Sequence, residues 1–159
     1  MQKIAELLKG RAFLTLATAS PAAQPNAVPK FILKFEAPNL YLIDYSIART
    51  AENLRANPRA SIALMDLDNL EGYRANGSVK LIEKGVEFDA LAKELDKKLV
   101  KLSTDRVIDA MKTGKKNDHF ELEIPDRFIV IKLTIEDVVK IGPQGDLFRE
   151  PEGATPSKP

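Results

Sequence analysis

Six segments of this chain carry the apolar patterns of β-strands, and their number and order limit the possible folds more than any other feature. Residues 72–83 alternate between apolar and polar side chains, which is the period of a strand with one buried face. Gly77 lies inside that segment, where a missing side chain predicts a bend or a close approach by another group. The predicted strands are residues 11–19, 25–36, 40–44, 59–67, 72–83 and 128–135.

Helical patterns occur outside these strands. The first ten residues mix charged and apolar side chains as an amphipathic helix does. A second helix, of about two turns, is predicted over residues 50–56. Asn57-Pro58 would end it, because the residue before a proline is pushed out of the α region.

The interval before the last strand contains the clearest helical pattern. Residues 88–102 repeat apolar side chains at three- and four-residue spacing. Ser103 or Thr104 could cap a second short helix, which Gly114 would end. After the last strand, the prolines and glycines of residues 142–159 predict a tail that lies over a neighbouring element or stays mobile.

Together these elements suggest a small, mainly β barrel. Its strands have mostly antiparallel neighbours, with a short helix after the third strand and a helical insertion before the last. Closing the sheet would remove its exposed strand edges. A length of 159 residues suits one domain with a continuous core. We therefore expect a barrel domain over residues 1–141 and a separate tail over residues 142–159.

Composition excludes several classes of function. The 24 basic and 23 acidic side chains leave a net charge of +1, so no global field would attract nucleic acid or an anionic membrane. The absence of cysteine excludes disulfides, thiolate catalysis and zinc sites built on sulfur. The charged N-terminal segment lacks the apolar run of a signal peptide, and no stretch reaches the roughly 20 apolar residues of a membrane span. We expect a cytoplasmic location.

Arg49-Thr50, at the start of the short helix, is the strongest candidate for a binding site. A helix N-terminus offers free N–H groups and partial positive charge, and a guanidinium matches phosphate oxygens. The segment therefore suits an anion such as a phosphate. The alternative is that Thr50 is only the N-cap and that Arg49 is a solvated surface charge.

A series of short motifs along the chain resembles a known family. This chain is similar to the FMN-binding split-barrel family related to pyridoxamine 5′-phosphate oxidase, over roughly residues 10–85. The resemblance implies a six-stranded antiparallel split β-barrel with Greek-key character. The motifs, in order, are Leu16-Ala17-Thr18, Pro25-Asn26-Ala27-Val28-Pro29, Leu40-Tyr41-Leu42, Arg49-Thr50-x-x-Asn53-Leu54, Asn57-Pro58-Arg59-Ala60-Ser61 and Gly77-Ser78-Val79.

The same resemblance implies a cofactor site and a partner. Arg49 and Thr50 would hold the FMN phosphate, and the backbone of the second strand would lie along the ring system. The loop before the helix would line the ribityl chain and ring, where Tyr45 could stack or could pack in the core. Asn53 would brace this loop. Members are usually homodimers with FMN near the subunit interface. Besides Arg49 and Thr50, the implied residues are Asn26, Ala27, Val28, Pro29, Lys30, Asp44, Tyr45 and Ser46.

The reaction does not follow from this resemblance. True pyridoxamine 5′-phosphate oxidases place an arginine and a histidine on a C-terminal segment, whereas His119 is the only histidine here and Arg149 has none nearby. We therefore expect a different oxidoreductase acting on a small molecule or an electron donor, with its catalytic residues unknown. A non-catalytic flavin or electron carrier and a deazaflavin-dependent reductase are the alternatives. Heme ranks last because only His119 could supply an imidazole ligand. The carboxylates of residues 66–71 lie at a predicted turn, and we expect no metal there.

Overall fold

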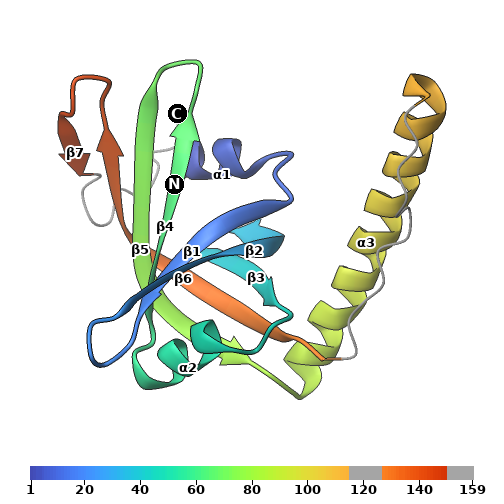
Figure 1. Ribbon diagram of the computed structural model, residues 1–159, viewed down its shortest axis with the longest axis horizontal. Coiled ribbons are helices and arrows are strands. Elements are labelled where there is room, and N and C mark those ends of the chain that lie inside the picture. The colour runs from blue at the N-terminus through green and yellow to red at the C-terminus, as the bar shows by residue number, and fades with distance from the viewer. Residues whose placement is uncertain (115–126, 150–159) are drawn as a thin grey trace, which may run out of the picture.

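The computed structural model describes residues 1–114 and 127–149, and in them seven strands form one antiparallel sheet with three helices around it (Figure 1). The strand order is β3-β2-β1-β4-β5-β6-β7, and a further pairing of β3 with β6 closes the first six strands into a barrel. The split-barrel prediction is confirmed. The elements are α1 (Gln2–Leu8), β1 (Phe13–Ala19), β2 (Pro25–Glu36), β3 (Asn39–Asp44), α2 (Arg49–Ala56), β4 (Arg59–Asp66), β5 (Glu71–Ile82), α3 (Val86–Thr113), β6 (Ile129–Ile141) and β7 (Leu147–Arg149).

The last barrel strand, β6, is longer than the sequence pattern predicts. It extends to Ile141 because β5 pairs with it along its whole length, from Gly72 opposite Ile141 to Ile82 opposite Val130. The same strand pairs with β3 on its other side. One bulge interrupts the β5–β6 pairing at Gly77, where an added Cβ would lie 1.9 Å from the carbonyl oxygen of Thr134. The predicted close approach at Gly77 is therefore confirmed.

Two apolar clusters cover the two faces of the β2–β3–β6 wall. The larger one fills the barrel and includes Leu16, Leu42 and Leu133, which are completely buried. Ile4 and Leu8 of α1 close one side of this interior. The second cluster lies outside the barrel, between the same wall and α3; its members include Phe31, Ile43, Leu95 and Val130. The wall therefore contributes alternate side chains to both clusters.

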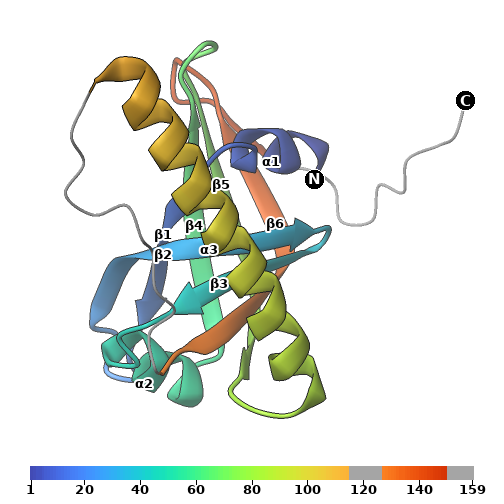
Figure 2. The ribbon, with the colours of Figure 1, turned by 90° about the vertical axis from the view of Figure 1, so that its right-hand side faces the viewer.

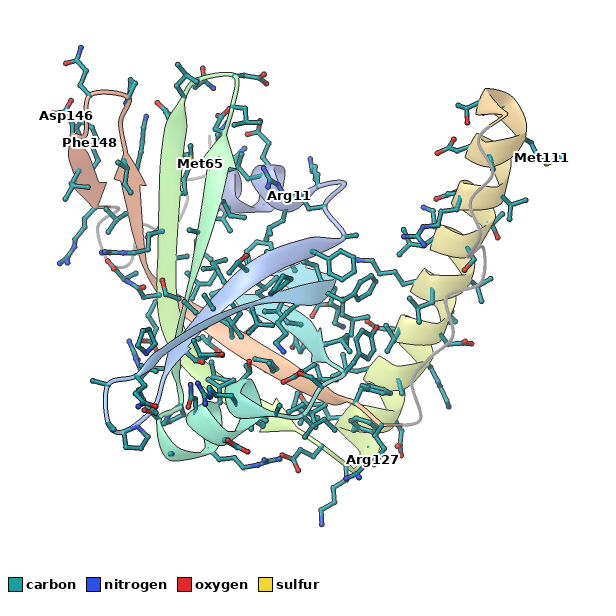
Figure 3. All side chains as sticks on the ribbon, viewed as in Figure 1. Arg11, Met65, Met111, Arg127, Asp146 and Phe148 are labelled. Atoms are coloured by element: carbon teal, nitrogen blue, oxygen red, sulfur yellow. The ribbon has the colours of Figure 1, made fainter. Side chains whose placement is uncertain are left out.

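The helical insertion is one helix rather than two. α3 runs unbroken through the predicted break, and the hydroxyl of Thr104 donates to the carbonyl of Val100 at 2.9 Å instead of capping a new helix. Gly114 ends the helix with φ +66°, as predicted. Leu91, Leu95 and Leu99 are its buried side chains, all in the first half. The second half leaves the barrel, with Met111 at the far end (Figures 1 and 3).

Part of the predicted tail belongs to the sheet. Residues 142–149 turn back so that β7 pairs with the end of β6, with Leu147 opposite Ile141.

At the other side of the molecule, α3 crosses the strands diagonally (Figure 2). None of the helices in residues 1–114 and 127–149 combines the length and the apolar character needed to cross a bilayer.

Candidate functional site

The start of α2 is a helix N-terminus without a cap. The helix begins at Arg49, its N-cap residue is Ala48, and no side chain of the described residues makes a capping hydrogen bond to it. The alternative in which Thr50 serves as the N-cap is therefore wrong. Within a helix, the N–H groups of Arg49, Thr50 and Ala51 have no acceptor of their own. Three donors and the positive end of the helix dipole converge at this point.

Arg49 is an exposed cation at this N-terminus. Its guanidinium has no hydrogen bond or ion pair with any of the described residues, whereas Arg55, at the other end of the same helix, lies 2.7 Å from a carboxylate oxygen of Glu83. An unpaired guanidinium beside free N–H groups is an arrangement that can bind a phosphate.

A partly buried hydrogen-bond network fixes the helix against the barrel. The side-chain amide of Asn26 donates to the hydroxyls of Thr50 at 3.1 Å and Thr18 at 3.3 Å. The side chain of Asn53 donates to the same Thr18 hydroxyl at 3.1 Å, so Asn53 braces β1 and not the loop before the helix. Thr50 is 3% exposed; its hydroxyl oxygen accepts from Asn26, and its hydroxyl hydrogen has no acceptor among the described residues. This network joins β1, β2 and α2 at one place.

The first half of β2 has a neighbouring strand on one side only. Residues 25–31 pair with β1, but pairing with β3 begins at Phe31, so residues 25–30 have a free edge. Ala27 and Pro29 are exposed there, Asn26 and Val28 are half-buried, and Lys30 is buried. The segment that the resemblance assigns to the flavin ring is thus an open strand edge beside α2.

Lys30 and Asp44 form a buried ion pair where β2 and β3 separate. The ammonium Nζ lies 2.6 Å from Asp44 Oδ1, and the two side chains are 3% and 0% exposed. The backbone N–H and hydroxyl of Ser46 donate to the same oxygen at 3.1 and 2.8 Å. Burial opposes ionisation of Asp44, but the bonds from Lys30 and Ser46 outweigh it and hold its pKa below the ordinary value. Asp44 Oδ2 is buried and has no partner in the described structure.

The loop between β3 and α2 has one residue in an unusual conformation. Ile47 has φ +44°, a region that β-branched residues rarely adopt. Tyr45 packs half-buried against the outer apolar cluster, one of the two roles open to it, and burial raises its pKa. Ser46 is exposed apart from its bonds to Asp44. The strained loop directs the chain away from β2 and into the first turn of α2.

A family model described as pyridoxamine 5′-phosphate oxidase matches residues 1–141. The chain belongs to this family. A comparison with curated protein sequences found no match.

Solved structures with the same fold come from members with different names. A pyridoxamine 5′-phosphate oxidase-related, FMN-binding protein from Nostoc punctiforme aligns over 94% of this chain and 90% of its own, with TM-score 0.57 and 16% identity. A heme-binding protein from Mycobacterium smegmatis aligns over 91% of this chain and 54% of its own, with TM-score 0.57 and 21% identity. An F420 reductase aligns over 84% and 93%, with TM-score 0.52 and 17% identity. At such identities the likeness concerns the fold.

The other charged candidates lie away from α2. Asp66 pairs with Lys3 at 2.8 Å and accepts from the side chain of Asn69 at 2.8 Å, which satisfies a carboxylate at the β4–β5 turn. Arg149 of β7 lies 3.8 Å from Asp137. His119 falls outside the described residues. Arg49, Thr50 and Asn26 are thus brought together, while Lys30 and Asp44 form a separate pair beside them.

Proposed function

We propose that this chain is an FMN-binding flavoprotein and that the start of α2 holds the phosphate of the cofactor. The uncapped N-terminus of α2 carries the proposal, because its free N–H groups, the Thr50 hydroxyl and the unpaired Arg49 guanidinium are all donors suited to phosphate oxygens. The donor set fits the group. Bound FMN would supply hydride or electron transfer, and the protein's part is to bind and orient it.

The free edge of β2 is the proposed seat of the ring, and the loop of Asp44, Tyr45 and Ser46 the proposed lining of the ribityl chain. Since Lys30 and Asp44 bond to each other, they would hold the free edge of β2 and the loop before α2 in place. Ser46 would present its exposed surface to the ribityl chain. We further propose a homodimer with FMN near the subunit interface, so that a second copy completes each site.

An oxidoreductase acting on a small molecule or electron donor is the leading activity, and a carrier without turnover is the alternative. A deazaflavin with a phosphate-bearing side chain would fit the same donors, and F420 reductase is the name of one protein with this fold. Heme is the weaker candidate, although one protein with this fold is named as heme-binding. Heme iron needs an axial ligand, and the only histidine of the sequence is His119.

The absorption spectrum of the purified protein tests which cofactor it binds. We expect a yellow protein with a flavin spectrum, or a colourless one that takes up added FMN. The released cofactor is then identified by mass. A colourless protein that refuses FMN would overturn the proposal, and a heme or deazaflavin spectrum would replace it. Light scattering with and without FMN reports the dimer, and oxidation of reduced nicotinamide by the loaded protein separates an enzyme from a carrier.

Arg49→Ala tests the phosphate site directly. Losing a charge-assisted bond to phosphate should weaken FMN binding by about tenfold or more and leave riboflavin binding unchanged, because riboflavin has no phosphate. Arg55→Ala is the matched control, since Arg55 is an exposed arginine on the same helix that pairs with Glu83. Equal loss of FMN and riboflavin in Arg49→Ala would show a structural role for Arg49 instead.

A further inference from the structure

The free edge of β2 has a hydrogen-bonding pattern that can be read residue by residue. The N–H of Ile32 donates to the carbonyl of Ala12 at 2.8 Å, and these two residues continue the β1–β2 register in which Phe31 faces Phe13. In an antiparallel pair, directly opposed residues alternate between bonding each other and pointing their polar groups away. Even-numbered residues of this stretch therefore bond to β1. Odd-numbered residues direct their N–H and C=O groups to the other side.

Only three residues contribute to the free part of that other side. At Phe31 the outward groups face Ile43 of β3, and β3 ends one residue later, at Asp44. Pro25, Ala27 and Pro29 remain. All three are exposed, and no described residue hydrogen-bonds to their outward backbone groups.

The two prolines make this edge chemically asymmetric. Proline has no N–H, so Pro25 and Pro29 present carbonyl oxygens alone. Ala27 presents both an N–H and a C=O. The edge therefore offers three acceptors and one donor, and the donor stands at the centre. Ala27 is thus the one residue of this free edge that presents both an outward N–H and an outward C=O.

We propose that Ala27 recognises an imide edge of the cofactor ring, an inference that rests on the proposed flavin site. In the pyrimidine part of an isoalloxazine, a ring N–H lies between two carbonyls. One carbonyl can accept from the Ala27 N–H while the ring N–H donates to the Ala27 carbonyl, which is the two-bond pairing of opposed residues in an antiparallel sheet. Pro25 and Pro29 fix the position of the ring along the strand because they offer no competing donor.

This arrangement also limits what the edge can distinguish. Its single donor is used on a ring carbonyl, so it has none left for the ring nitrogen N5. The edge should therefore accept a flavin and a 5-deazaflavin equally and should reject a ring that is methylated at the imide nitrogen. Specificity would depend on the imide, not on the redox-active centre.

Titration of the wild-type protein with three phosphate-free ligands is the first test. Riboflavin and 5-deazariboflavin should bind within about threefold of each other, and 3-methylriboflavin should bind about tenfold more weakly, as expected for loss of a hydrogen bond with an unpaired carbonyl left behind. Equal binding of riboflavin and 3-methylriboflavin would overturn the role of Ala27 while leaving the flavoprotein proposal intact. A wild-type protein that binds neither riboflavin nor FMN would overturn both the role of Ala27 and the flavoprotein proposal.

Ala27→Pro removes the donor itself. The strand already holds proline two residues to either side, in the same outward orientation, so the barrel should keep its melting temperature. Riboflavin and FMN should both bind about tenfold more weakly. Ala27→Val keeps the N–H and should bind both flavins within about threefold of wild type. Undiminished binding by a folded Ala27→Pro protein would refute the proposal; should that variant not fold, the 3-methylriboflavin titration decides.

Discussion

The two halves of β2 have opposite roles in one continuous strand. Residues 31–36 pair with β3 and begin with three buried apolar side chains, which face the barrel interior and α3 in turn. Residues 25–30 pair with β1 alone and alternate between exposed and half-buried side chains until Lys30. The difference begins where β3 stops. Residues 31–36 become framework because they pair with β3 and pack against the barrel core and α3, and residues 25–30 can become a binding surface because their edge beyond the end of β3 is left open.

Breaking the ion pair at the boundary should have the largest effect. Lys30→Met leaves the buried Asp44 carboxylate without its partner, which costs about 3–5 kcal/mol of unfolding free energy. Urea denaturation measures it. Combining Lys30→Met with Asp44→Leu replaces both charges by apolar groups and should recover most of the loss. If the unfolding free energy of Lys30→Met lay within about 1 kcal/mol of the wild-type value, a buried charged pair would be contradicted.

Truncating a core side chain in residues 31–36, the half of β2 that pairs with β3, should have the second-largest effect on stability. Ile32 is 3% exposed and belongs to the barrel core, so Ile32→Ala should cost about 2–5 kcal/mol. Val28→Ala, on the same side of the strand but half-buried in the open half, should cost less. Thermal or urea unfolding gives both values. Equal costs would mean that the two halves are packed alike.

Acid should weaken the Lys30–Asp44 ion pair, which lies at the boundary between the two halves of β2. The pKa of Asp44 is lower in the folded than in the unfolded chain, so its stabilising contribution is complete above the unfolded pKa and is lost as the pH falls through the folded pKa. Between about pH 6 and pH 3, wild type should lose more unfolding free energy than the Lys30→Met, Asp44→Leu double variant. Parallel pH profiles would show that Asp44 contributes nothing to acid sensitivity.

Changing the open edge should have the smallest effect on stability. Pro29→Ala affects an exposed residue whose backbone nitrogen points away from β1, and it mainly increases the freedom of the unfolded chain. The expected cost is about 0.4–1 kcal/mol. Thermal unfolding measures it. A cost of several kcal/mol would mean that the open half of β2 supports the barrel after all.

Local patterns in the sequence predicted most of the framework. The alternation of residues 72–83 led to β5, and Asn57-Pro58 gave the end of α2 correctly. They could not predict the length of α3, because a serine and a threonine that could cap a helix can equally lie inside one. Nor could they predict β7, which is three residues long and exists only because the end of β6 offers an edge to pair with.

The site was predicted less completely. The positions of Arg49, Thr50 and Asn26 near one another agree with the segments singled out, but the Lys30–Asp44 pair was not foreseen. In a strand that alternates apolar and polar residues, Lys30 and Lys34 both fall on the polar face. Ile32, between those two lysines, was the available signal that this face turns inward toward the barrel core. Pairing between residues 14 positions apart depends on the β2–β3 register, which one sequence does not reveal.

The prolines of β2 have one more consequence, for the protein without its cofactor. An open strand edge with a full set of donors and acceptors is a template on which another chain can add a strand, and edges of this kind lead to aggregation. Pro25 and Pro29 remove two of the three outward donors, so an incoming strand would find one complete residue between two mismatched ones. The edge can stay open to a small molecule while resisting assembly with other polypeptides. The protein without its cofactor can therefore stay in concentrated solution without aggregating through the free edge of β2.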